Sequence, residues 1–171
     1  MTTTTCPGCG LGHEALDLEP ADDLDATGEC AREFGSVSAP FYAEAALVPH
    51  RQYVVDAYAC QHPSVQSRRA VQTTALCLMT LDLILDVGLD VSLGSRLHQQ
   101  MMRKHPAVFV PLRKPDLVGT LNHRHLARAQ TDQTSLEGAA REWAESVWQA
   151  WRGHHDQVRQ WNRALVPEWL T

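Results

Sequence analysis

Two cysteines near the start of the chain, Cys6 and Cys9, have the spacing of a metal-binding knuckle. Thiolates separated by two residues can both reach one tetrahedral ion at about 2.3 Å, and a following glycine, here Gly10, lets backbone amides turn toward the sulfur atoms. The pair is therefore interpreted as half of a structural zinc site. Its alternatives are a chance pair and a redox dithiol, but a dithiol normally follows a strand, and no strand pattern precedes Cys6.

A structural zinc ion requires two further ligands. Cys30 is the third ligand that the sequence favours, because it opens a predicted helix and a polar loop long enough to fold back links it to the knuckle. For the fourth ligand we prefer His50, in the first turn of its helix, with His62 next and His13 third. The main hypothesis is thus a zinc-binding helical protein in which zinc is structural and the role is binding or scaffolding.

The elements that must position these ligands are predicted to be helices. Residues 10–28 have no helical periodicity and form an acidic loop after the knuckle. Apolar spacing, prolines and caps, with Ser64 and Thr134 as two of the capping residues, indicate helices over residues 29–38, 50–61, 64–87, 91–104 and 134–165. The helix over 64–87 is expected to be the most buried. We therefore predict one all-α domain over 1–171, with a knuckle and loop (1–28) and a bundle of about five helices (29–171).

Several short motifs occur along this framework: Cys6-Pro7-Gly8-Cys9-Gly10, His50-Arg51, Val55-Asp56-Ala57-Tyr58-Ala59, Gln61-His62-Pro63, Trp143-Ala144-Glu145-Ser146-Val147-Trp148 and His154-His155. As a set they resemble a bacterial family catalogued only as a domain of unknown function, over most of the chain. The resemblance supports the architecture and the chosen residues, and it implies no activity.

An alternative hypothesis is a metal-dependent enzyme. His154 falls in the middle of the apolar stripe predicted for the last helix, where its imidazole would reach His50, Asp56 or His62 on a facing helix. Such a cluster would hold a metal in an open site, with Asp56 as a ligand or as the acceptor that orients a histidine. These four residues are the catalytic candidates.

This second arrangement is similar to the DinB-like metal-binding helical bundles. Those proteins place a paired His-x-x-x-His on a late helix, whereas here His154 and His155 are adjacent and point about 100° apart. The competing interpretation is that His154 is a core histidine with a satisfied hydrogen bond and that Asp56 pairs with Arg68 or Arg69. His98 and the segment His123-Arg124-His125 are interpreted as surface residues.

Composition limits the class of protein, its location and its partners. The 171 residues are 44% apolar and 20% charged, which is typical of a globular protein, and no segment combines the length and apolarity of a membrane span. Five cysteines without a secretory signal predict a cytoplasmic protein, in which Cys60 and Cys77 are inert buried thiols. The net charge of −5 and the absence of a reading motif argue against nucleic acid. A protein partner or a homo-oligomer remains open, with Trp148 and Trp169 expected to be the most exposed tryptophans.

Overall fold

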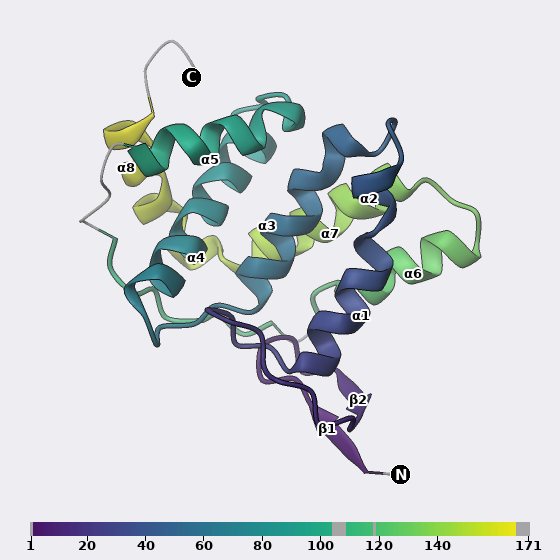
Figure 1. Ribbon diagram of the computed structural model, residues 1–171. Helices are drawn as coiled ribbons and strands as arrows, with labels where there is room; N and C mark the ends of the chain where they lie inside the picture. Colours follow the sequence, from purple (N-terminus) through teal and green to yellow (C-terminus); the bar gives the residue numbers. More distant parts are fainter. Residues whose placement is uncertain (1, 104–108, 118, 167–171) are drawn as a thin grey trace.

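Helices form most of the computed structural model, which describes residues 2–103, 109–117 and 119–166 (Figure 1). These residues form a hairpin and eight α-helices: β1 (Thr3–Thr5), β2 (Gly12–Glu14), α1 (Gly28–Ser38), α2 (Pro40–Ala43), α3 (Arg51–Gln61), α4 (Arg68–Leu81), α5 (Gly94–Arg103), α6 (Arg124–Thr131), α7 (Leu136–Ala150) and α8 (His155–Leu165). The predicted all-α class is confirmed. The described residues contain more than the five long helices predicted, because the short helices α2 and α6 also form and the last helix is divided into α7 and α8.

The central element is α3, which packs against both α4 and α7. Nearly all of its residues are buried, including the polar side chains of Gln52, Asp56 and Gln61. A helix without a solvent face must satisfy its polar groups inside the protein. The polar residues of α3 therefore lie at the places where other elements bring hydrogen-bond partners or ligands to it.

The start of α4 differs from the sequence expectation. Ser67 caps this helix, because its extended backbone lets its Oγ accept a hydrogen bond from the amide of Ala70 at 2.9 Å. Ser64, the expected cap, instead accepts a hydrogen bond from the amide of Gln66 within the preceding loop. The helix ends in one wider turn over Asp82–Asp86.

Tryptophans form the centre of the core. Trp143, Trp148 and Trp151 are fully buried, so the expected exposure of Trp148 is wrong, and Trp169 lies outside the described residues. The indole of Trp143 donates to Gln61 Oε1 at 3.2 Å, and the indole of Trp151 donates to the carbonyl of Cys60 at 3.0 Å. These bonds fix the end of α3 against α7.

The N-terminal hairpin lies at one end of the molecule, next to the start of α1 (Figure 1). Its two antiparallel strands pair Thr3 with Glu14 and Thr5 with Gly12, so the knuckle forms the connection between them. Among the described residues, none of the helices has the length and apolarity required to cross a membrane.

Candidate metal centre

Four side chains converge between the hairpin, the start of α1 and the end of α3: Cys6, Cys9, Cys30 and His62. Their candidate ligand atoms all lie within 4.8 Å of one another. The Sγ atoms of Cys9 and Cys30 are 3.8 Å apart, and His62 Nε2 lies 3.4 Å from Cys30 Sγ. The sulfur atoms are too distant for a disulfide bond of about 2.05 Å, and all five cysteines are free.

These separations agree with the edges of a tetrahedral zinc site. Zn–S bonds of about 2.3 Å and a Zn–N bond of about 2.0 Å place two sulfur atoms about 3.8 Å apart, and sulfur and nitrogen about 3.5 Å apart. The observed values are 3.8 Å and 3.4 Å. Two edges of the cluster therefore match a tetrahedral zinc site, and its other ligand atoms lie within 4.8 Å of one another.

The hairpin positions Cys6 and Cys9. The amide of Cys6 donates to the carbonyl of Leu11, and the amide of Gly10 donates back to the carbonyl of Cys6, both at 2.9 Å. Gly10 has a φ of +74°, a conformation that glycine adopts without steric cost. The expectation that no strand precedes Cys6 is wrong, since β1 does so; three threonines carry no alternating pattern from which to predict it. A turn rather than a helix follows Cys6, unlike a redox dithiol.

Gly8 allows the knuckle to contact His62 closely. A β-carbon at this position would overlap the imidazole of His62 and would lie 2.5 Å from the carbonyl oxygen of Asp25. The backbone amide of Asp25 also donates to the carbonyl of His62 at 3.0 Å. The loop after the hairpin is thus fastened to the end of α3 directly behind the ligands.

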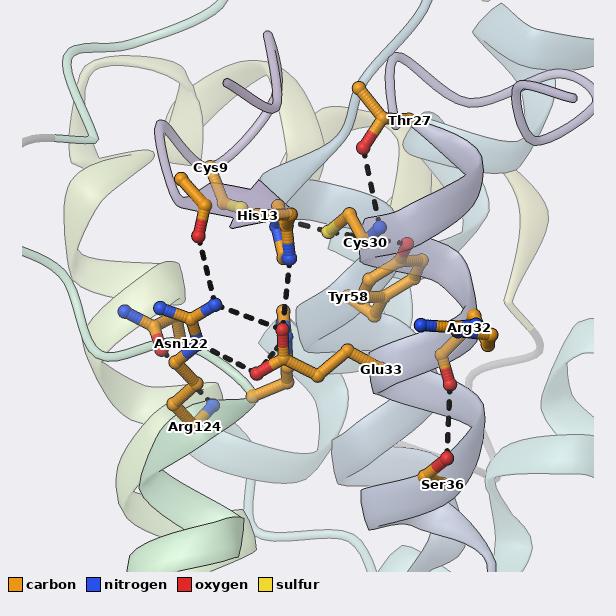
Figure 2. Close-up of polar contacts among 12 residues, drawn as sticks. Cys9, His13, Thr27, Cys30, Arg32, Glu33, Ser36, Tyr58, Asn122 and Arg124 are labelled. Atoms are coloured by element: carbon orange, nitrogen blue, oxygen red, sulfur yellow. Dashed lines mark hydrogen bonds and ion pairs between the residues drawn. The ribbon is translucent and has the colours of Figure 1, made fainter. Parts of the chain in front are cut away.

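Cys30 lies in the first turn of α1. Thr27 caps this helix, with its Oγ1 accepting from the amide of Cys30 at 3.2 Å (Figure 2). The positive end of the helix dipole favours a thiolate at this position. The hydroxyl of Tyr58 donates to Cys30 Sγ at 3.7 Å, and the Tyr58 ring stacks on Phe34 with 3.8 Å between ring centroids.

His62 is fully buried at the end of α3. Its Nδ1 is 2.7 Å from the carbonyl oxygen of Tyr58, and because a carbonyl can only accept, Nδ1 carries the proton. The lone pair of Nε2 then faces the sulfur atoms. A backbone carbonyl that fixes the tautomer in this way is typical of metal-binding histidines.

The electrostatics of the cluster favour bound positive charge. Burial lowers the pKa of His62, but hydrogen bonds with Cys6 and Cys9 outweigh burial and raise this pKa to about 9. Hydrogen bonds from Cys30 and Cys9 lower the pKa of Cys6 far below its usual range. The pKa of Cys30, in contrast, is raised by the contacts of Cys30 with Cys6 and Cys9. A divalent cation can replace the protons that these groups share.

The structure does not bring His50 to this cluster. His50 precedes α3 whereas His62 follows it, so the two lie about 18 Å apart along the helix axis. His50 Nε2 instead lies 3.5 Å from Glu137 Oε1, and His13 Nδ1 lies 2.9 Å from Glu33 Oε2. The preferred fourth candidate is therefore corrected from His50 to His62, the second choice of the sequence analysis.

A second polar network connects the hairpin to α1 and α6 through Glu33 (Figure 2). Arg124 donates to both carboxylate oxygens of Glu33, at 2.6 and 3.0 Å, and also to the carbonyl of Gly12 at 3.0 Å. The hydrogen bonds from Arg124 lower the pKa of Glu33 to about 2. His123 lies fully buried beside this pair, so its interpretation as a surface residue is wrong, and burial lowers its pKa to about 4.

The four catalytic candidates are not brought together. The helix breaks after Ala150, so His154 leaves the apolar stripe and its Nε2 lies 2.9 Å from the carbonyl of Arg113. Asp56 contacts neither Arg68 nor Arg69 in any ion pair of the described residues; Arg69 pairs with Asp23. Asp56 instead pairs with His98, whose Nε2 lies 3.3 Å from its Oδ1. His98 was expected on the surface, because the contact forms only through the packing of α5 against α3 and α4 and leaves no local signal.

Comparison with protein families gives a match over most of the chain. The model of a family of unknown function (DUF5946) matches residues 4–152, a range that includes all four residues of the cluster, strand β2 and all of β1 except Thr3. Comparisons with curated proteins and with solved structures gave no match.

Proposed function

We propose that this chain, which belongs to the family of unknown function DUF5946, is a zinc-binding protein in which Cys6, Cys9, Cys30 and His62 hold one structural ion. The observation that carries the proposal is the set of separations within the cluster, which agree with a tetrahedral site. Zinc is the metal we infer, because three thiolates and one imidazole in tetrahedral geometry form one of its common structural ligand sets.

The closed ligand set supports a structural ion, and we propose binding or scaffolding as the role of the protein. Four protein ligands leave no coordination position for water or a substrate, so this ion would act on folding rather than on a reaction. It would join the hairpin, α1 and α3, and its binding energy would add to the free energy of folding. Free thiols at all five cysteines support a reducing compartment, and we place the protein in the cytoplasm.

The test is zinc content combined with thermal unfolding. Zinc per chain would be measured by mass spectrometry of the metal in the wild type and in Cys30→Ser, and unfolding would be followed with and without a chelator. We expect Cys30→Ser to lose one equivalent of zinc. Zinc removal should lower Tm by about 10 °C or more, since a structural ion contributes several kcal/mol.

The matched control is Cys60→Ala, which removes a buried thiol outside the cluster. This variant should keep its zinc at the centre even if the loss of packing lowers Tm slightly. Equal zinc content in the wild type and Cys30→Ser, or a wild-type Tm that does not change with the chelator, would contradict the proposal.

A further inference from the structure

Asp56 is an acidic residue buried in the middle of α3, and only one of its two carboxylate oxygens has a hydrogen-bond partner among the described residues. Its side chain is fully buried, and its Oδ1 accepts from Gln52 Nε2 at 2.8 Å and lies 3.3 Å from His98 Nε2. Its Oδ2 is also buried, and no hydrogen bond to it exists within the described parts of the chain. A buried carboxylate oxygen without a donor is costly, so this atom has capacity for a further ligand.

Two more potential metal ligands lie beside Asp56. Cys77 comes from α4 and His98 from α5, and the candidate ligand atoms of the three residues lie within 4.8 Å of one another. Carboxylate, thiolate and imidazole are all ligands of zinc and related transition metals. Three helices therefore contribute one ligand each to a second cluster, separate in residues from the first.

The side chain of Gln52 is held in a fixed orientation next to this cluster. Ser95 donates to its Oε1 at 3.3 Å, which directs its amide nitrogen to Asp56. Gly94 permits the approach of α5, since a β-carbon there would overlap the side chain of Gln52. A donor that fixes a ligating carboxylate is a usual second layer around a bound metal.

The cluster also has access to solvent. Cys77 and His98 line a cavity of about 760 Å³, together with Tyr58, Val55, Thr73 and Arg69 among others. The first cluster has four ligands and is closed, whereas this one has three ligands, two of which, Cys77 and His98, lie at the wall of an open cavity with Asp56 buried behind them. Three protein ligands and an open position are the arrangement of zinc sites that bind water or a substrate.

We propose that Asp56, Cys77 and His98 bind a second divalent transition-metal ion, with one coordination position open to this cavity. The position would take water or a small molecule that offers an oxygen or nitrogen donor. The competing arrangement is a simple buried ion pair between Asp56 and His98, with Cys77 as an inert thiol. This site is independent of the structural zinc site and would make the protein a candidate for metal-dependent chemistry.

Cobalt(II) is a suitable probe, because thiolate ligation gives it a charge-transfer absorption in the near ultraviolet. Full-length protein with zinc in the first site would be titrated with cobalt. We expect one further equivalent to bind with this absorption. Cys77→Ser should abolish the absorption, while Cys60→Ser, which alters a neighbouring thiol that contacts Cys77 but is not one of the three ligands, should retain it.

A second variant guards against a failure of Cys77→Ser to fold. His98 is partly exposed, so His98→Gln should keep the fold, and we expect it to weaken cobalt binding at least tenfold. Gln52→Leu should weaken it by about 10- to 100-fold through loss of the oriented donor. Circular dichroism and the zinc content of the first site would be measured on every sample.

Two results would overturn the second site: no further cobalt equivalent in folded, zinc-containing wild type, or an unchanged absorption in Cys77→Ser and His98→Gln. Either result would leave the first site intact in the same samples. The Asp56–His98 contact would then be the ion pair alone.

Discussion

At the scale of single residues, Gly8 sets the distance between the knuckle and His62. We predict that Gly8→Ala weakens zinc binding and destabilises the fold by about 1–3 kcal/mol, because the new methyl group would overlap the imidazole and a backbone carbonyl. Gly12→Ala is the matched control, since a β-carbon there meets nothing within 4 Å. Zinc affinity by chelator competition and urea unfolding would compare them. Equal effects of the two variants would show that the close approach is unimportant.

His123 offers a separate prediction about pH. Burial lowers its pKa from 6.5 to about 4, although the neighbouring Glu33 acts in the opposite direction. His123 therefore binds a proton more readily in the unfolded chain than in the folded one. The stability that the neutral, buried His123 contributes is complete above pH 6.5 and is lost as the pH falls toward 4. When the pH falls from 7 to 5.5, the free energy of unfolding should decrease by about 1 kcal/mol more in the wild type than in His123→Gln.

The measurement is urea unfolding at several pH values, and the difference between the two curves removes effects common to both proteins, including metal release. His125→Gln is the control, because His125 lies in a more exposed contact with Glu142. A difference curve that does not change with pH would show that His123 titrates normally in the folded protein.

At the scale of elements, the Glu33–Arg124 pair joins α1 to α6, and Arg124 extends the connection to β2 through the carbonyl of Gly12. We predict that Arg124→Lys costs about 1–2 kcal/mol, because lysine keeps the charge but loses the forked geometry. Arg141→Lys, which alters an exposed pair with Glu145 within α7, should change stability by less than about 0.5 kcal/mol. Thermal unfolding of both variants tests this; a larger loss in Arg141→Lys would contradict it.

The sequence predicted those elements whose signals are local. Pro40 and Pro63 gave the ends of two helices, and the cysteine spacing gave the knuckle, because backbone sterics and ligand reach act over a few residues. The choice between His50 and His62 depended on which end of α3 meets the hairpin. That contact is tertiary and leaves no local signal, and the same holds for the pairing of Asp56 with His98.

The break between α7 and α8, in a turn that contains Gly153, shows a different limit. Apolar spacing continued across it, so the pattern predicted one helix through residues 134–165, whereas the structure turns between α7 and α8. A glycine lowers helix stability by only about 1 kcal/mol, which is too little to predict a break by itself. The turn takes His154 off the predicted apolar stripe. His50 and His62 also lie at opposite ends of α3, so the group of four catalytic candidates fails at both places.

At the scale of the whole molecule, the hairpin and the helical core depend on different interactions. The core around α3, α4 and α7 is formed by large buried side chains, including Trp143, Trp148 and Leu78. The hairpin has two strands of three residues, and such a short hairpin is at most marginally stable by itself. Apart from the cluster, it is attached by contacts such as those of Arg124 with Gly12 and Lys114 with Pro7.

This division predicts how the protein responds to metal removal. Hydrogen exchange with a chelator should first expose the amides of Cys6 and Gly10, which bond within the knuckle, while amides in α4 and α7 stay protected. Zinc removal frees three elements from one another but removes no tryptophan from the core, so we expect local opening before global unfolding. Cys30→Ser should show the same pattern without a chelator. Simultaneous loss of protection in the hairpin and in α7 would mean that the ion supports the entire fold rather than its N-terminal end.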